Sequence, residues 1–181
     1  MPEAGDELNL SPIGAVFRVI RTAAETDGRA LEMQWLLEPG AHGTPVHIHP
    51  SATETYEVLE GKLDLYVDGA WKVLGEGERG SAPPGTPHTF RNSSRSRTRV
   101  FNTHSPAMRF GDYFETIHRI VDSGVIEPSR MTPKAMLYLS MVMTRFEDEI
   151  ISVRPPQIVV RIASRVARLL GYRIPAPKPR V

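Results

Sequence analysis

The sequence contains no cysteine among its 181 residues. A disulfide framework, a thiolate metal site and a cysteine nucleophile are therefore excluded, which leaves histidine and carboxylate side chains as the ligands for a metal. The sequence also has no run of about 18 apolar residues, so we expect no segment to span a membrane. The first ten residues, MPEAGDELNL, lack the basic start and apolar run of a signal peptide. We therefore expect the protein in the cytoplasm.

The remaining composition is ordinary for a globular protein, with 40% apolar and 24% charged residues. The length predicts one domain with room for an appendage. A net charge of +1 conceals an uneven distribution, because residues 153–181 contain only basic charges: Arg154, Arg161, Arg165, Arg168, Arg173, Lys178 and Arg180. Such a split indicates either an interaction tail or the solvated face of a terminal helix.

The first part of the chain, up to about Pro106, predicts short strands separated by turns. Segments with alternating or β-favouring residues are 16–22, 30–38, 54–60, 62–69, 70–75 and 100–104. The pairs Glu60-Gly61 and Asp68-Gly69 are turn signals at hairpin spacing, the second being the stronger. Many short strands without a helical pattern between them predict a mainly β domain, a sandwich or barrel, over residues 1–110.

The character of the sequence changes after residue 110. Helical spacing of apolar residues predicts helices at 113–124, 133–150 and 155–172, which form a C-terminal helical segment over residues 111–174. The last stretch, 175–181, is rich in proline and basic residues, and we expect it to be extended and poorly ordered.

Two histidines one residue apart provide the first chemical signal. In a strand, His47 and His49 point to the same face, so both imidazoles can reach one point inside a barrel. Glu54 follows after a short loop, and its carboxylate can turn toward the same point. Further along, His88 follows the bend PPGTPH and is expected to point inward together with Phe90 and Asn92. A nitrogen and oxygen donor set of this kind suits Fe, Mn, Ni, Cu or Zn.

These residues resemble the two sequence signatures of the cupin superfamily. The first, His-x-His, three or four residues, Glu, six residues, Gly, is matched by His47, His49, Glu54 and Gly61. The second, Gly, five residues, Pro-x-Gly, two residues, His, three residues, Asn, is matched by Gly77, Pro83, Gly85, His88 and Asn92. One departure is that the glycine ahead of the first histidine falls one place early, at Gly40.

The resemblance implies a double-stranded β-helix, the jelly-roll barrel of cupins, followed here by the helical segment. It also implies one divalent transition metal per chain, held by His47, His49, Glu54 and His88, with coordination positions left open for a ligand. Asn92 is expected to secure its turn. Glu54 is the candidate catalytic residue, because it can move a proton if burial raises its pKa.

Other residues have rival interpretations. Glu57 competes with Glu54, but alternation places it on the opposite face of the strand. We expect His42 to be an exposed loop residue, and the alternative is that it hydrogen-bonds to a metal ligand. We expect a structural or surface role for His104 and His118. Among the aromatic residues, Tyr56 and Phe90 share faces with Glu54 and His88, and are the candidates for substrate contact. Trp35 and Trp71 are expected in the core or in dimer contacts.

The last predicted helix is amphipathic, with Arg161, Arg165 and Arg168 on one face and apolar residues on another. We expect the apolar face to pack against the protein, with attachment to an anionic membrane surface as the less favoured alternative. The basic stretch SSRSRTR has no interleaved aromatic residues, so binding of nucleic acid is not expected. The resemblance to cupins, which commonly pair through barrel edges, implies a homodimer, with the C-terminal helices either capping the barrel or contributing to the interface.

The function that follows is that of a metal-dependent, dioxygenase-like enzyme acting on a small oxygen-bearing organic molecule, similar to the quercetin-dioxygenase-like cupins. The alternatives are an isomerase or hydrolase that uses the same metal, or a non-catalytic cupin that binds a small ligand.

Overall fold

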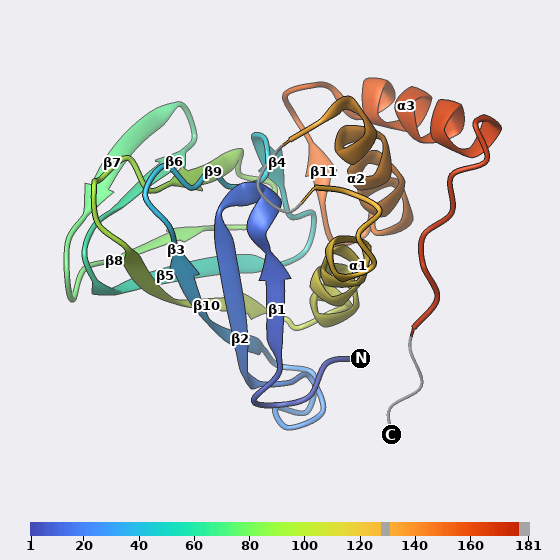
Figure 1. The fold of residues 1–181 in the computed structure, drawn as a ribbon. Helices are drawn as coiled ribbons and strands as arrows, with labels where there is room; N and C mark the ends of the chain where they lie inside the picture. The colour runs from blue at the N-terminus through green and yellow to red at the C-terminus, as the bar shows by residue number, and fades with distance from the viewer. Residues whose placement is uncertain (128–130, 178–181) are drawn as a thin grey trace.

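The computed structural model describes residues 1–127 and 131–177, so the end of the predicted tail, 178–181, lies outside the described residues. Two antiparallel sheets face each other and form the barrel (Figure 1). The six-stranded sheet has the order β1 (Glu7–Leu10), β2 (Ala15–Arg21), β3 (Leu31–Leu37), β10 (Thr98–Ser105), β5 (Thr53–Glu60) and β8 (Arg79–Ala82). The five-stranded sheet has the order β11 (Ile151–Ser152), β4 (His47–Ile48), β9 (His88–Arg91), β6 (Leu63–Val67) and β7 (Ala70–Leu74). The predicted jelly-roll fold with C-terminal helices is confirmed.

Alternation along the strands builds the core between the sheets. In β3 every second residue is buried, from Leu31 to Leu37, and Trp35 is only 1% exposed. The Trp35 ring stacks on Phe17 with ring centroids 4.2 Å apart and meets Phe90 at 5.0 Å. Trp35 is therefore a core residue, whereas Trp71 on β7 is 46% exposed beneath the guanidinium of Arg91.

The two predicted turns have different outcomes. Asp68-Gly69 forms the tight hairpin between β6 and β7, with both residues at positive φ and Val67 paired with Ala70. Glu60-Gly61 is also a turn, but the hairpin expected there is wrong. The turn carries the chain from β5 in one sheet to β6 in the other.

Within the described residues, three α-helices stack outward from one side of the barrel (Figure 1). α1 (Phe110–Asp122) packs against β1, α2 (Pro133–Arg145) against α1, and α3 (Gln157–Leu169) against α2. The hydroxyl of Thr132 accepts a hydrogen bond from the Ala135 amide and caps α2 at the predicted start. α2 ends at Arg145, earlier than the predicted residue 150. The chain then returns to the barrel, where β11 pairs with β4.

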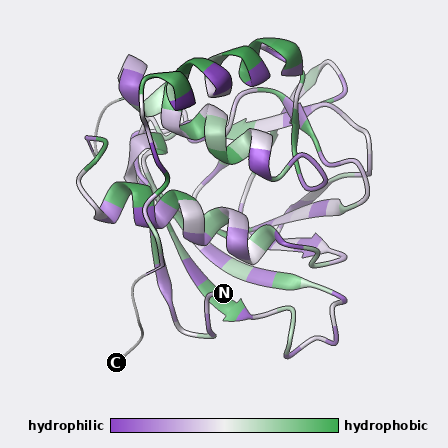
Figure 2. Ribbon diagram, turned by 90° about the vertical axis from the view of Figure 1, so that its right-hand side faces the viewer, coloured by the Kyte–Doolittle hydropathy of each residue, from purple (hydrophilic) through white to green (hydrophobic). Residues whose placement is uncertain are grey.

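The expected orientation of the last helix is wrong. α3 packs on α2 through Val160, Ser164 and Ala167, whereas its other valine, isoleucine and leucine side chains are exposed to solvent. Small side chains allow the two helices to approach closely, so the narrow small-residue face lies inside. In Figure 2 this helix lies along the outer edge of the molecule and carries mainly hydrophobic residues. No helix of the described part of the chain is both long and apolar enough to cross a membrane.

Replacement of Gly61 by alanine tests the turn that joins the sheets. Gly61 has φ +83°, and a Cβ there would lie 2.8 Å from the Arg97 carbonyl oxygen. Gly69 has φ +91° but no heavy atom within 4 Å of a Cβ. The left-handed conformation costs roughly 1–2 kcal/mol at either site, and the clash at Gly61 adds about 1–3 kcal/mol. In urea denaturation, Gly61→Ala should therefore lose clearly more unfolding free energy than Gly69→Ala. Equal losses would contradict the close approach.

Candidate metal centre

Strand register and alternation bring five polar side chains together between the sheets. In the five-stranded sheet, His47 on β4 is the cross-strand partner of His88 on β9. In the six-stranded sheet, Glu54 on β5 is the cross-strand partner of His104 on β10. His49 directly follows β4, two residues after His47, and therefore points the same way. The two sheets thus place imidazoles opposite a carboxylate.

The four expected metal ligands form one compact donor set. His47, His49, Glu54 and His88 each offer one nitrogen or oxygen atom, and these atoms lie within 4.8 Å of one another. All four side chains are buried, with exposed fractions of 0–4%. Donors bound at about 2.0–2.2 Å around one ion span a similar distance, so the set fits a single divalent transition metal.

Backbone carbonyls fix the orientation of each imidazole. The Nδ1 of His47 lies 2.9 Å from the Pro45 carbonyl oxygen, and that of His88 lies 2.8 Å from the Thr86 carbonyl oxygen. The Nδ1 of His49 lies 2.7 Å from the Glu149 carbonyl oxygen. A carbonyl accepts only, so Nδ1 carries the proton in each ring, and Nε2 presents its lone pair to the centre when the imidazole is neutral.

This arrangement requires a cation. The Nε2 atoms of His49 and His88 lie 3.0 and 2.9 Å from the same Glu54 oxygen, Oε2. Two unprotonated nitrogens and an anionic oxygen at such distances repel one another unless a proton or a metal ion lies among them. The donor set therefore fits a metal by its chemistry as well as by its dimensions.

Two polar residues behind the donor set were missed as site residues in the sequence. Asn102 donates a hydrogen bond from Nδ2 to Glu54 Oε1 at 2.8 Å, and His104 Nε2 lies 3.4 Å from the same oxygen. The Nδ1 of His104 has no hydrogen-bond partner within the described residues, so no carbonyl fixes this ring. His104 therefore lies beside the Glu54 carboxylate. The sequence predicted a structural or surface role for His104, and the structure places it within the site. The signal lay in β10, where the inward positions 100, 102 and 104 carry two polar side chains.

The charges of the cluster are mutually adjusted. Burial alone would raise the pKa of Glu54, but the surrounding imidazoles, His104 first, hold that pKa well below its usual value. A proton-shuttle role for Glu54 depends on a raised pKa, whereas the structure lowers that pKa. Burial, followed by the charges of the neighbouring imidazoles, lowers the pKa of His47 well below its usual value. Burial lowers the pKa of His104 to about 3. At neutral pH the centre therefore contains an ionised carboxylate and at least two neutral imidazoles.

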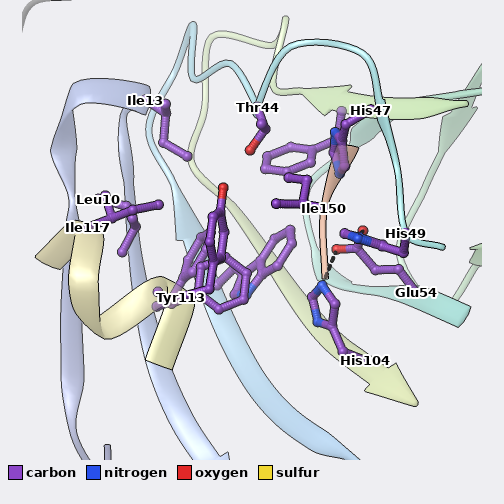
Figure 3. A pocket seen from close by; sticks show the side chains of 14 residues that line it. Leu10, Ile13, Thr44, His47, His49, Glu54, His104, Tyr113, Ile117 and Ile150 are labelled. Atoms are coloured by element: carbon purple, nitrogen blue, oxygen red, sulfur yellow. Dashed lines mark hydrogen bonds and ion pairs between the residues drawn. The ribbon is translucent and has the colours of Figure 1, made fainter. Parts of the chain in front are cut away.

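A cavity of about 30 Å³ opens beside the centre (Figure 3). His47, His49, Glu54 and His104 form its polar end. Most of the remaining wall is apolar: Leu10, Ile13, Phe17, Trp35, Phe90, Phe114, Ile117 and Ile150. Two hydroxyl residues, Thr44 and Tyr113, also line it and face each other (Figure 3). Burial raises the pKa of Tyr113 to about 12, against a hydrogen bond with Thr44, so its hydroxyl stays protonated.

The C-terminal segment forms part of this centre. Besides the Glu149 carbonyl that fixes His49, α1 contributes Phe110, whose ring lies 4.8 Å from that of His49. Tyr113 from α1 and Ile150 from the segment before β11 line the cavity. The candidate metal centre therefore combines the barrel with the C-terminal segment as far as Ile150.

The other predicted site residues are distributed as follows. Phe90 lines the cavity, whereas Tyr56 is buried in the core, 0% exposed, and is not among the lining residues. Contact of either residue with substrate stays a prediction. Glu57 points away from the centre and pairs with Arg79 at 2.8 Å. His42 is exposed and His118 accepts a hydrogen bond from the Asn9 amide, both apart from the donor set. Asn92 secures its turn by donating to the carbonyls of residues 37, 38 and 96.

Comparison with known proteins gives matches to the barrel. The family model of the Cupin domain, Cupin_2, matches residues 33–104. Quercetin 2,3-dioxygenase of Bacillus subtilis (strain 168) is 43% identical over 56 residues, which cover 31% of this chain and 16% of that enzyme. The chain therefore corresponds to less than a fifth of that enzyme's length.

Two solved structures are similar in fold. An RmlC-like cupin from Shewanella frigidimarina has a TM-score of 0.50 and 22% identity, and the match covers 61% of this chain and 92% of that chain. KdgF from Halomonas sp. has a TM-score of 0.52 and 20% identity, and the match covers 59% and 90% of the two chains. At such low identity the similarity concerns the fold alone.

Metal addition should stabilise the protein through this centre. A metal that binds only the folded state, present at 100 times its dissociation constant, adds about 2.7 kcal/mol to the unfolding free energy. We expect this gain, measured by denaturant titration of metal-free protein with and without Mn²⁺, Fe²⁺, Ni²⁺, Cu²⁺ or Zn²⁺. His88→Ala should abolish the gain and His42→Ala, at an exposed histidine, should keep it. Equal gains in both variants would place the metal elsewhere.

The hydrogen bond from Asn102 to Glu54 should contribute to metal affinity. Loss of a group that orients a metal ligand typically weakens binding 10–100-fold, and we expect that loss for Asn102→Ala in calorimetric titration. Asn92→Ala removes an equally buried amide whose hydrogen bonds go to the carbonyls of residues 37, 38 and 96 and not to the donor set. It should lower the thermal midpoint while leaving metal affinity of the folded protein unchanged. If both variants lose affinity alike, general loosening of the barrel is the cause.

Proposed function

The chain belongs to the cupin superfamily, and from this premise we propose that it is a metal-dependent, dioxygenase-like enzyme acting on a small, mainly apolar molecule that bears oxygen donors. The observation that carries the proposal is the buried set of three imidazoles and one carboxylate at the end of an apolar cavity. The local identity to quercetin 2,3-dioxygenase supports the oxygenase class.

A divalent transition metal bound to His47, His49, Glu54 and His88 would supply Lewis-acid chemistry and open coordination positions for oxygen ligands. The protein's part is orientation. Hydrogen bonds from Nδ1 to backbone carbonyls hold the imidazole rings, and Asn102 holds the carboxylate. The low pKa of Glu54 keeps it in the form that binds a cation.

The cavity wall selects the substrate. Its apolar side chains favour a hydrocarbon or aromatic body and exclude water from the reacting group. Within the cavity, the hydroxyls of Thr44 and Tyr113 can hydrogen-bond a second polar group and fix the orientation of the molecule. The present volume of about 30 Å³ holds one or two water-sized molecules. A substrate with a full ring must therefore displace lining side chains.

The alternative of an isomerase or hydrolase is less well supported for anionic substrates. None of the lining residues is lysine or arginine, so a phosphate or a second carboxylate would enter the cavity without a counter-charge. A neutral or singly charged substrate whose oxygen binds the metal suits the wall better.

Oxygen uptake tests the proposal. Elemental analysis of the purified protein should find about one transition metal per chain. The metal-loaded protein should then consume dioxygen in step with the loss of a flavonol or diketone, followed with an oxygen electrode and by absorbance. His88→Ala should abolish uptake and His42→Ala should retain it. Tyr113→Phe should keep the metal but raise KM more than it lowers kcat.

Different outcomes separate the functions. Conversion of a substrate without oxygen uptake would identify an isomerase or hydrolase. Tight binding of the candidates without conversion would identify a ligand-binding cupin. Either result would overturn the oxygenase assignment.

A further inference from the structure

The outermost helix presents a continuous apolar surface to solvent. Exposed fractions from 42% to 87% are found for six residues of α3 and its C-terminal end: Ile158, Val159, Ile162, Val166, Leu169 and Leu170. At about 100° per residue they cover an arc of about 120°. We call this arc the α3 apolar face. Isolated exposed apolar residues are ordinary, but a contiguous set on one helix is typical of an interaction surface.

Arginines line one border of the α3 apolar face. Arg161, Arg165 and Arg168 are exposed and occupy the neighbouring arc of the helix. Arg161 bonds to Glu147, 2.9 Å from Nε to a carboxylate oxygen. Arg165 and Arg168 form no ion pair with any described residue, and α3 contains no acidic residue. Two cationic groups therefore stand beside the apolar surface without a counter-charge.

Charge decides between the occupants of this face. A second copy of the chain would bring the same arginines to the same contact, and no carboxylate of α3 could pair with them. An anionic lipid surface offers both complements: headgroup charges for the arginines and the acyl boundary for the apolar side chains. Long arginine side chains can extend along the border of the apolar arc toward the headgroups.

The position of α3 in the fold permits such contact. It is the outermost layer of the helical stack, and β7 and the closed part of the barrel lie at the opposite end of the molecule (Figure 1). The helix is already folded against α2 through its small-residue face. A membrane could receive the apolar face without unfolding the helix or opening the barrel.

We propose that α3 attaches the protein to the surface of membranes that contain anionic lipids, with its apolar face inserted at the headgroup boundary and its arginines on the phosphates. The attachment is peripheral. It is independent of the metal centre and of the reaction proposed for it.

Vesicle flotation with the full chain tests the proposal. The protein should float with phosphatidylcholine vesicles that contain 30% phosphatidylglycerol, a composition chosen for the assay, and bind far less to phosphatidylcholine alone. Raised salt should weaken the binding, because it screens the headgroup charge. Ile162→Glu with Leu169→Glu should reduce the bound fraction at least tenfold.

Matched variants assign the effect to α3. Arg165→Gln with Arg168→Gln leaves the apolar face intact and should weaken binding roughly tenfold or more at low salt. Val73→Glu places the same charge on another exposed apolar residue, 56% exposed on β7, and should not change binding. Near-ultraviolet circular dichroism checks that each variant keeps its fold.

Three results would overturn the proposal. The first is a wild-type protein that does not float with anionic vesicles. The second is equal loss of binding in Val73→Glu and in the α3 variants. The third is a dimer, seen by light scattering, that Ile162→Glu with Leu169→Glu dissociates, which would assign the face to a second copy.

Discussion

The site depends on one electrostatic constraint: inside the barrel, the Glu54 carboxylate lies against the Nε2 atoms of His49 and His88, and a proton or a metal ion must lie among them. Transfer of a lone carboxylate into such an interior costs several kcal/mol. The amide of Asn102 offsets only part of that cost, because it donates a single hydrogen bond to Glu54. A cation held between Glu54 and the Nε2 atoms removes the repulsion among the lone pairs that face one another. The donor set is therefore stable as a set only with its ion or with a proton in its place.

The constraint originates in the backbone. The carbonyls of Pro45, Thr86 and Glu149 accept from Nδ1 of the three histidines and thereby decide which nitrogen faces inward. Their contribution does not depend on their side chains. Two of these carbonyls lie two residues before the histidine they orient, so local turn geometry suffices. The third lies a hundred residues further along the chain than His49. Only the return of the chain after α2, with β11 paired to β4, brings it there.

This distinction explains what the sequence could and could not predict. His47, His49, Glu54 and His88 were identifiable because their spacing follows strand alternation and the turns that glycine requires, both local properties. The cavity hydroxyls of Thr44 and Tyr113 were not, because they meet only after α1 docks on the barrel. Among the strands, the long alternating ones such as β3 and β5 were predicted within one residue at each end. The short strands β4 and β11, of two residues each, have no periodicity and exist only through their partners. His104 was predictable in part. Its inward position follows from alternation along β10, but its position opposite Glu54 depends on the pairing of β10 with β5.

The orientation of α3 shows the same limit for helices. An amphipathic pattern states that a helix has an apolar and a polar side, but it does not state which side the rest of the protein covers. In α3 three arcs compete: large apolar, basic and small. The small arc packs against α2 because Ser164 and Ala167 allow the backbones of the two helices to approach closely. The isoleucine and leucine side chains of α3 would hold the two helices farther apart. Burial of the larger side chains would gain more apolar area within this chain alone, at roughly 25 cal/mol per Å². A helix that leaves that area uncovered in its folded position is arranged for a second surface, and the uncompensated arginines beside it restrict that surface to one of negative charge.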